Sequence, residues 1–476
     1  MSVCQREEEE PGVFLGQSKG MCRECRQLVD ARYLSDGEAV YLQTLCPTHG
    51  NAKAMVAESL SWYLDALAAP IAERPPPKVI ARNGESCPKA CGPCEFHSQK
   101  CNLPVFSITN ACDLRCPICF TYNRADQTYF MSPEEFGKHI DYVVDVTGGV
   151  DLVNITGGEP TLHPQLFDLL AQAKRPEIGR ITLNSNGITI AENPEIAKRL
   201  ADEGVYLILS LNTMDSERSR ELHGRDLTAL KAKTLEALAR YNVQTTLLMV
   251  LTGNVNEDEV STLVDLALTS DFVRSLTIQT MTYTGQGGGN FGPRKHISVD
   301  GVERRIEEAT NGQIRQADFM PLPTAHPLCY GVSYLFLDAQ GKAHSLGALL
   351  GKETLAKHLM DGYLLHPSSA LEQELHAAID RLWSQEESPE LLQAVKEMLR
   401  TLYPKDQTLT IHERQRRAER AVKTIYVHAH MDESTYEVGR AMRCPDQVPV
   451  NAERLVGACN YNLFYRMKDE RFWVEK

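Results

Sequence analysis

The middle of the chain alternates between two hydrophobic patterns. Short runs rich in β-branched residues are typical of buried strands, and the longer stretches between them place apolar residues at helical spacing. The predicted strands are 103–109, 151–156, 180–185, 205–211, 244–251 and 273–281. The predicted helices are 132–146, 164–175, 194–203, 227–241, 256–269 and 300–311. Six such units predict an α/β fold with a parallel sheet and right-handed crossovers, and six rather than eight indicate a partial (β/α)6 TIM-like barrel.

The pattern changes on both sides of this region. Residues 66–86, with three prolines at their centre, are typical of a linker, and residues 368–403 have the periodicity of a solvated helical pair. We therefore expect four parts. They are a metal-binding module at 1–70, a linker with a cysteine segment at 71–101, the barrel at 102–312 and a C-terminal α+β auxiliary-cluster and helical domain at 313–476.

Three cysteines follow the first predicted strand of the barrel. Cys112, Cys116 and Cys119 have the spacing C-x3-C-x2-C and lie on the loop after residues 103–109. In barrel enzymes the active site is formed by the loops at these strand ends. Three thiolates fit one face of a [4Fe–4S] cluster and leave its fourth iron open, whereas four would saturate it. A zinc knuckle or an unrelated group of cysteines is the alternative.

Other strand ends carry glycine and polar residues. Gly157, Gly158 and Glu159 follow the second strand, where glycines let backbone carbonyls come close and the glutamate supplies a charge partner for an amine. The polar residues after later strands are Asn186, Ser210, Asn212 and Arg225. For the first three, ordinary turn chemistry is the alternative, and for Arg225 it is a surface position at the start of a helix. A glycine-rich stretch at 284–290 would admit substrate or adenine, although a flexible loop is the simpler interpretation.

The cysteine spacing, with Gly157-Gly158-Glu159-Pro160 one strand later, resembles the radical S-adenosylmethionine (radical SAM) superfamily. In that superfamily the open iron chelates the amino and carboxylate groups of SAM, and reductive cleavage gives a 5′-deoxyadenosyl radical. The resemblance implies that the three cysteines hold this cluster and that the glycine-glutamate stretch binds the SAM ammonium group. It also implies that the SAM ribose and carboxylate are bound by Asn186, Ser210, Asn212 and Arg225. Ile118 departs from the pattern, because an aromatic residue often stands there; Phe120 follows instead.

Two further cysteine groups precede the barrel. Cys22 and Cys25, followed by Cys46 and His49, resemble a rubredoxin-like or zinc-ribbon site for mononuclear iron or zinc, with His49 or a more distant cysteine as the fourth ligand. The second group is Cys87, Cys91, Cys94 and Cys101. Four thiols predict a fully ligated auxiliary [4Fe–4S] cluster. Without Cys101 the cluster would be open, and zinc is the alternative metal.

Three cysteines follow the barrel at Cys329, Cys444 and Cys459. Each alone is typical of a buried core thiol, but together with the family resemblance they predict a third cluster. His428 and His430 are candidates for its fourth ligand or for proton transfer, and an alternating strand is the simpler interpretation.

The cysteine groups and the tail together resemble the group that contains archaeal tetraether lipid synthases and the dihydropterin methylases of methanogens. This resemblance implies radical attack on an unactivated C–H bond, and the tail favours C–C coupling of lipid chains. Methylation or other alkylation of a small heterocycle, such as a dihydropterin, is the alternative. An apolar tunnel would favour the lipid, and a compact polar pocket the heterocycle. A non-catalytic iron–sulfur electron carrier or a zinc-ribbon protein is the alternative outside the enzymes.

The implied cofactors are SAM, its [4Fe–4S] cluster, one or two auxiliary [4Fe–4S] clusters and a mononuclear iron or zinc. The implied reducing partner is a ferredoxin or flavodoxin. A net charge of −13 over 476 residues argues against a nucleic-acid partner. Fourteen cysteines without an export signal or a membrane helix indicate a cytoplasmic metalloprotein. A lipid substrate would add peripheral membrane contact.

Overall fold

The computed structural model describes residues 12–474 except 80–86, 124–125, 293–294, 386–387, 406 and 408. The chain begins with an antiparallel sheet whose strands lie in chain order, and a short helix follows it. These elements are β1 (Val13–Met21), β2 (Leu28–Ser35), β3 (Val40–Cys46), β4 (Gly50–Ala57) and α1 (Leu60–Ala68). Helix α1 therefore occupies the start of the predicted linker, whose last seven residues lie outside the described part of the chain.

Six parallel strands form the centre of the molecule, each hydrogen-bonded to the next in chain order. They are β5 (Leu103–Ser107), β6 (Val150–Thr156), β7 (Ile178–Ser185), β8 (Tyr206–Ser210), β9 (Thr245–Leu251) and β10 (Val273–Thr280). The helices that connect them are α2 (Pro133–Thr147), α3 (Leu166–Ala173), α4 (Ile188–Glu192), α5 (Glu195–Asp202), α6 (Ser216–His223), α7 (Thr228–Arg240) and α8 (Val260–Thr269). All six predicted strands are present close to their expected bounds. Their sequences are nearly continuous apolar runs because parallel strands are covered on both faces.

The C-terminal part of the chain extends this sheet at both edges. β14 (Lys423–His428) pairs in parallel with β10, and β15 (Asp446–Asn451) pairs in parallel with β5. The remaining strands are β11 (Met320–Pro321), β12 (Tyr330–Leu337), β13 (Ala343–Ser345) and β16 (Arg454–Gly457). The added strands satisfy backbone groups that an open six-stranded sheet would expose at its edges. The division at residue 312 stays a prediction, but strands from both sides of it share one sheet.

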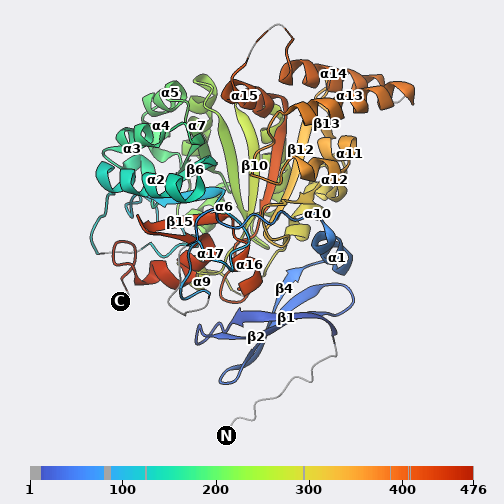
Figure 1. Cartoon of the computed structure of the whole chain (residues 1–476). Coiled ribbons are helices and arrows are strands. Elements are labelled where there is room, and N and C mark those ends of the chain that lie inside the picture. The colour runs from blue at the N-terminus through green and yellow to red at the C-terminus, as the bar shows by residue number, and fades with distance from the viewer. Residues whose placement is uncertain are drawn as a thin grey trace.

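Helices after β10 lie beside β12 and at the two ends of the strands (Figure 1). α10 (Val299–Ala309) follows β10, and the helices on the side of β12 are α11 (Leu346–Leu350), α12 (Lys352–Lys357), α13 (Ser369–Ser384), α14 (Pro389–Leu402) and α15 (Ile411–Ala421). The predicted helical pair is confirmed as α13 and α14. Three short helices, α9 (Gly287–Asn290), α16 (Val438–Met442) and α17 (Ala458–Asn460), lie at the end of the body that faces the β1–β4 sheet, and α13–α15 lie at the opposite end (Figure 1).

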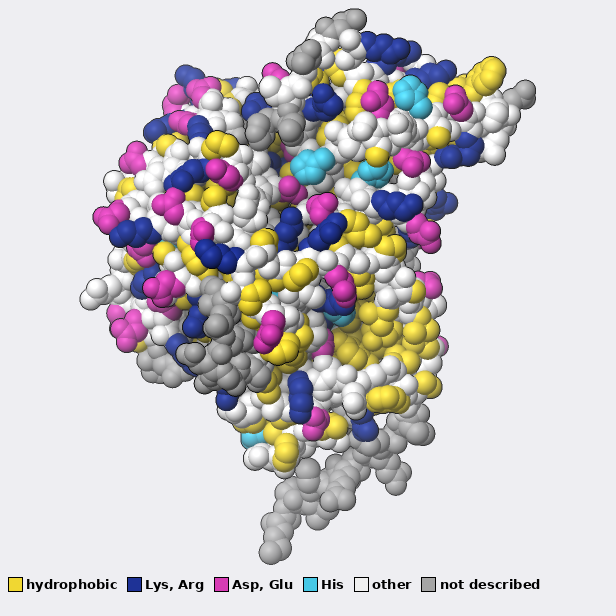
Figure 2. Space-filling model, viewed as in Figure 1, with side chains coloured by type: hydrophobic (Ala, Val, Ile, Leu, Met, Phe, Trp, Pro, Cys, Tyr) yellow, Lys and Arg dark blue, Asp and Glu magenta, His cyan; other side chains and the backbone are white. Residues whose placement is uncertain are grey.

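The visible surface carries charges of both signs, interspersed rather than gathered by sign (Figure 2). Hydrophobic side chains gather at the lower right of this face, near α1, whose Leu64 and Leu67 are exposed. No helix in the described residues has the length and hydropathy that a membrane crossing requires.

Candidate functional site

The three cysteines of the central motif lie on the loop between β5 and α2. Cys112 is exposed, and Cys116 and Cys119 are partly buried. Burial of its sulfur atom raises the pKa of Cys116 to about 12. A thiol must lose its proton to bind a metal, so these groups become thiolates when a cation replaces the proton.

The two glycines after β6 let their own backbone pack directly against the backbone segment that leads into the cysteine loop. A Cβ atom on Gly157 would overlap the carbonyl oxygen of Thr109, and one on Gly158 would overlap that of Ala111. The Gly158 N–H donates to Thr109 O at 2.8 Å, and the Glu159 N–H donates to Ala111 O at 2.6 Å. Only residues without a side chain fit this approach. The glycine pair therefore fixes the path of the chain into Cys112.

Glu159 connects the ends of β6 and β7. Its carboxylate is buried and accepts hydrogen bonds from the Thr161 hydroxyl at 2.6 Å, the Ser185 hydroxyl at 2.9 Å and the Asn186 N–H at 2.7 Å. Burial raises the pKa of this carboxyl group, and the hydrogen bonds lower it. Asn186 in turn donates from its side chain to Asp113, beside Cys112, at 2.6 Å. The predicted contact of Glu159 with the SAM ammonium stays a prediction, since protein donors already bind both carboxylate oxygens.

Lys231 is a buried cation that the sequence interpretation missed. Its ammonium group donates to the carbonyl oxygens of Asn186 and Ser210, both at 2.5 Å. Burial lowers its pKa to about 8, while the charges of nearby Cys116, Glu159 and Asp113 act in the opposite direction. A signal was available, because Lys231 lies on the buried stripe of α7 that includes Leu238.

The remaining predicted SAM residues are placed differently from one another. Asn186 and Ser210 come together through Lys231. Asn212 is buried, and its amide is bound on both sides: Oδ1 accepts from the Val250 N–H at 2.7 Å, and Nδ2 lies 3.0 Å from His223 Nε2. Arg225 is exposed, and it follows Gly224, where an added Cβ would lie 3.9 Å from Pro117 of the cysteine loop.

The aromatic residue beside the third cysteine faces the interior. Ile118 packs against Leu222, Met281 and Tyr283, whereas Phe120 stacks on His430 with ring centres 5.0 Å apart. The glycine-rich stretch 284–290 packs against the same loop: the Gly287 N–H donates to Cys119 O at 2.7 Å. Its bare backbone therefore allows the close approach of two protein loops, and a role in admitting substrate or adenine stays a prediction.

A cavity of about 240 Å³ is lined by strands of the central sheet and reaches the loop that carries Cys112, Cys116 and Cys119. Phe120 and Gly157 border it near the cysteines, and Tyr330, Tyr363 and Asp446 border it elsewhere. Apolar strand residues make up much of the wall. Polar side chains among them are Asn154, Thr182, Asn184, Gln279 and His428. Such a mixture is typical of small-molecule sites.

Asp446 is the acidic group of this cavity. Its carboxylate accepts a hydrogen bond from the Tyr330 hydroxyl at 2.6 Å and another from the Tyr363 hydroxyl. Burial raises the pKa of Asp446 to about 6. His428 stacks on Tyr330 with ring centres 3.9 Å apart, and burial lowers the pKa of His428 and that of His430. Both imidazoles are therefore neutral near pH 7.

One C-terminal segment contacts two cysteine groups, the one that contains Cys91 and the loop of Cys112–Cys119. Residues Tyr461–Tyr465 form a π-helix, a rare element that occurs frequently at functional sites. The side-chain amide of Asn460 donates to Cys91 Sγ at 3.2 Å, while that of Asn462 donates to Phe120 O at 2.8 Å. Arg466 donates to Tyr122 O at 2.7 Å. No periodic signal in the sequence indicates this arrangement.

The other cysteines fall into separate surroundings. Cys91 packs with Val448 and Tyr461, whereas Cys101 belongs to the core of the central sheet. After the barrel, Arg440 donates to Cys329 Sγ at 3.3 Å, and Cys459 Sγ lies 3.6 Å from His430 Nδ1. Burial raises the pKa of the Cys444 thiol, and the charges of Asp446, Cys459 and Cys329 act in the same direction.

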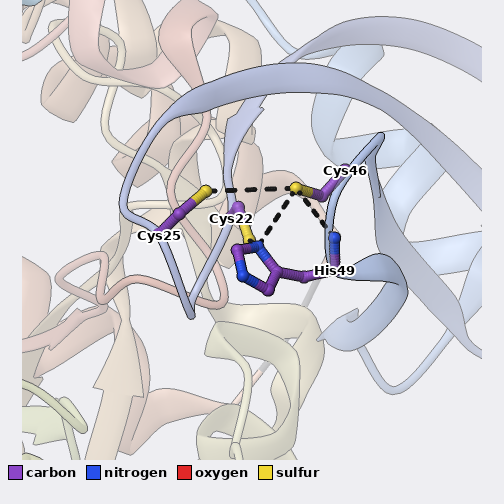
Figure 3. Close-up of side chains that lie close together, drawn as sticks. All are labelled: Cys22, Cys25, Cys46 and His49. Carbon is purple, nitrogen blue, oxygen red and sulfur yellow. Dashed lines mark hydrogen bonds between the residues drawn. The ribbon is translucent and has the colours of Figure 1, made fainter.

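The N-terminal module brings four ligand atoms together (Figure 3). The sulfur atoms of Cys22, Cys25 and Cys46 and a ring nitrogen of His49 all lie within 4.8 Å of one another, a spacing that suits a single metal ion. Cys22 Sγ and Cys46 Sγ lie 3.6 Å and 3.5 Å from His49 Nδ1. The backbone N–H of His49 lowers the pKa of Cys46 to about 6, which favours the thiolate. His49, rather than a distant cysteine, completes this set.

Two family models match the chain. Residues 106–267 match the Radical SAM superfamily, and residues 14–58 match the HMPTM N-terminal zinc ribbon domain. The first match contains the C-x3-C-x2-C loop and the Gly157–Glu159 stretch; the second contains the Cys3His set. Residues 106–267 are therefore a radical SAM domain, which makes the chain an enzyme with a [4Fe–4S] cluster and SAM as its cofactors.

Known proteins are similar to this chain over different shares of its length. A 7,8-dihydro-6-hydroxymethylpterin dimethyltransferase of Methanocaldococcus jannaschii is 23% identical over 492 aligned positions, which cover 95% of each chain. A GTP 3′,8-cyclase of Chlorobaculum tepidum is 30% identical over 36% of this chain and 52% of the cyclase, so the match spans about half of that relative. The solved structure of Streptococcus suis SuiB bound to S-adenosylmethionine is 20% identical over 45% of this chain and 44% of SuiB, with a TM-score of 0.36. The dihydropterin dimethyltransferase, which matches along nearly its whole length, favours the methylation alternative over lipid coupling.

Proposed function

We propose that this radical SAM enzyme attaches a methyl or other alkyl group to an unactivated carbon of a small heterocycle such as a dihydropterin. The observation that carries the proposal is the compact cavity beside the cysteine loop. Its wall combines apolar strand residues with polar side chains such as Asn154, Gln279 and His428, a mixture that suits a small heterocycle better than an alkyl chain. The similarity to the dihydropterin dimethyltransferase along 95% of the chain supports the same conclusion.

In this proposal the strands β5–β10 form a partial (β/α)6 barrel, and Cys112, Cys116 and Cys119 hold the catalytic cluster at its rim. When bound, the cluster and SAM supply the 5′-deoxyadenosyl radical that takes a hydrogen atom from the substrate. Gly157 and Gly158 hold the loop close to the strand ends. Glu159 sets the positions of Ser185 and Asn186, and Lys231 holds the carbonyls of Asn186 and Ser210 toward the cysteine loop.

Auxiliary metal sites complete the proposal. Cys87, Cys91 and Cys94 hold a second cluster, and the separate position of Cys101 in the core favours an open site over a fully ligated one. Cys329, Cys444 and Cys459 hold a third, with His430 at Cys459 as the nearest candidate for a further ligand. The N-terminal set holds zinc, in line with the matched ribbon family. A ferredoxin or flavodoxin supplies electrons in the cytoplasm.

The test is product analysis under anaerobic conditions. Reconstituted protein is incubated with SAM, dithionite, a one-carbon donor and 7,8-dihydro-6-hydroxymethylpterin, and the pterin is examined by mass spectrometry. We expect its mass to rise by whole CH2 units, and we expect no change with the Cys112→Ala/Cys116→Ala/Cys119→Ala variant. An unchanged pterin in the presence of continued SAM cleavage would contradict the proposed substrate class.

A further inference from the structure

The cavity contains one carboxylate without a close cationic partner. Asp446 is 4% exposed. Within the described residues, the one basic side chain at ion-pair distance is His428, whose Nε2 lies 3.7 Å from Asp446 Oδ2 and whose ring stacks on Tyr330. Burying a carboxylate is costly unless donors or a cation compensate it. Two tyrosine hydroxyls alone meet part of that cost.

Three separate parts of the chain fix this carboxylate. β15 carries Asp446 beside Leu103 of β5, β12 carries Tyr330, and Tyr363 follows α12. Tyr330 donates to Oδ2 and Tyr363 donates to Oδ1. An ionised carboxylate has about four acceptor positions, two on each oxygen. Each oxygen of Asp446 therefore keeps one free position for a ligand in the cavity.

We propose that Asp446 is the substrate-recognition residue, which binds the exocyclic amino group and the adjacent ring N–H of an amino-substituted nitrogen heterocycle. This inference rests on the proposed function and specifies how the enzyme recognises its substrate. Two parallel N–H donors match the two oxygens of a carboxylate, and charge-assisted pairs of this kind are strong and geometrically specific. Tyr330 and Tyr363 are positioning residues, because they hold the carboxylate without touching the reacting atoms.

The position of Asp446 also orients the ring. Asp446, Phe120 and Gly157 all border the cavity. Asp446 lies opposite Leu103 at the start of β5, whereas Gly157 follows the end of the parallel strand β6, so the carboxylate lies toward the other end of the strands. A heterocycle anchored by its amino edge at Asp446 therefore presents the opposite edge toward the cysteine loop. The flat pair formed by His428 and Tyr330, whose planes differ by 12°, offers an aromatic surface beside the anchored edge.

A competing role for Asp446 is that of a metal ligand, since Cys444 precedes it by two positions. The contact between them is through the backbone: Cys444 Sγ donates to Asp446 O at 3.1 Å, and the side-chain oxygens are bound by the tyrosines. Replacing Asp446 by a neutral residue distinguishes the role of metal ligand from that of substrate recognition. Loss of a ligand lowers the iron content, and loss of a recognition group lowers substrate affinity alone.

The experiment uses the full chain, reconstituted anaerobically, and two probes. One is 7,8-dihydro-6-hydroxymethylpterin, and the other is the matching dihydrolumazine, in which a carbonyl acceptor replaces the amino donor. We expect the wild-type protein to bind the pterin at least about tenfold more tightly, as the loss of a charge-assisted hydrogen bond predicts. Asp446→Asn replaces one acceptor by a donor, so we expect it to lose about tenfold or more in pterin affinity and to prefer the lumazine.

The matched control is Asp338→Asn. Asp338 is a carboxylate of similar side-chain burial that pairs with His344 near the β12–β13 hairpin, outside the cavity wall. It should leave both affinities unchanged. Iron content should be equal in all variants, and Asp338→Asn should also keep the wild-type amount of 5′-deoxyadenosine formed with SAM and dithionite alone. If Asp446→Asn does not fold, Tyr363→Phe, which removes one hydroxyl, should still weaken pterin binding several-fold.

The outcomes separate this inference from the proposed function. If the wild-type protein alkylates the dihydropterin but binds pterin and lumazine equally, or if Asp446→Asn and Tyr363→Phe keep wild-type affinities, the recognition role alone is wrong. Loss of iron in Asp446→Asn would make the residue a metal ligand and would also overturn it. If the wild-type protein cleaves SAM but binds neither heterocycle, both the inference and the proposed function fail.

Discussion

Arg26 of the N-terminal metal module donates a hydrogen bond to the Tyr122 hydroxyl, 2.8 Å away, three residues after Cys119. The same guanidinium donates to Leu463 O at 2.8 Å and lies 2.9 Å from the Glu433 carboxylate. Arg26 has a φ of 56°, a left-handed conformation that is uncommon outside glycine. The turn that carries Cys22 and Cys25 thus places this side chain against the segment that follows Cys119.

We predict that Arg26→Ala weakens the coupling between the N-terminal module and the catalytic loop. It leaves the partly buried Glu433 without its cation and frees Tyr122, so we expect a loss of about 1–3 kcal/mol in the free energy of unfolding. We also expect several-fold slower SAM cleavage with unchanged zinc content. Urea titration and 5′-deoxyadenosine formation measure the two effects. Arg23→Ala, which removes an exposed pair with Glu24, should change neither; equal effects of the two substitutions would refute the coupling.

Gly158→Ala should displace the catalytic loop. The new Cβ would overlap Ala111 O, and that atom belongs to the backbone and has little room to move. We expect most of the SAM-dependent activity and of the iron bound at the central motif to be lost, while zinc at the N-terminal site is kept. Gly204→Ala is the matched control at a position with open space, although its positive φ will add some backbone strain. Full iron loading of Gly158→Ala would show that the close approach is not required.

Lys231→Met removes a buried positive charge near Cys116. The carbonyl oxygens of Asn186 and Ser210 lose their donor, and an added electron on a cluster at the central motif would lose a nearby cation. We therefore expect weaker SAM binding and a more negative reduction potential, measured by an electron paramagnetic resonance redox titration. Lys233→Met, on the exposed side of the same helix, should leave the potential unchanged. A potential that shifts equally in both variants would contradict a local charge effect.

Glu303 should make the folded protein less stable as the pH rises. It is buried, accepts a hydrogen bond from Trp62 of α1 at 2.9 Å, and burial together with the charge of Asp300 raises its pKa to about 8. In the unfolded chain the same group ionises near pH 4.5. Between these values the folded state holds a proton that the unfolded state has released, so the free energy of unfolding falls as pH rises.

Glu303→Gln stays neutral and removes this dependence. We expect the variant to match the wild-type protein near pH 4.5 and to exceed it at pH 8 by an amount on the order of a few kcal/mol. Urea titrations across this range measure the difference. Glu308→Gln serves as the control, because Glu308 is an exposed residue of α10, the helix that also carries Glu303, and it should show no such trend. A difference that does not vary with pH would rule out Glu303 as the titrating group.

The sequence predicted the six central strands because each combines an apolar run with a following amphipathic helix. It also predicted the need for Gly157 and Gly158, since a Cβ atom at either position cannot fit. It did not predict that β14 and β15 extend the sheet, because the partners of a short strand depend on contacts far along the chain. Lys231 was missed because a lysine in a helix is usually solvated. The hydrogen bonds of Asn460, at the end of α17, and of Asn462, in the π-helix that follows, have no periodic sequence signal.

Function was predicted more accurately at the level of the reacting radical than at the level of the substrate. The cysteine spacing determines the first, because thiolate number decides whether an iron stays open. In our proposal the substrate is recognised by groups such as Asp446 and Tyr363, which are distant in sequence and meet only in the folded chain. For that reason the tail motif suggested a lipid, whereas the cavity and the dihydropterin dimethyltransferase favour a heterocycle.

The most direct test of this account is to follow deuterium from the substrate. The reconstituted protein is supplied with SAM, dithionite and a dihydropterin deuterated at its ring and side-chain carbons, and the 5′-deoxyadenosine is analysed by mass spectrometry. We predict that the nucleoside gains deuterium and that the Cys112→Ala/Cys116→Ala/Cys119→Ala variant forms none. If the intact, cluster-loaded protein forms 5′-deoxyadenosine without deuterium at any labelled position, the dihydropterin is not the molecule that the radical attacks, and the central claim is wrong.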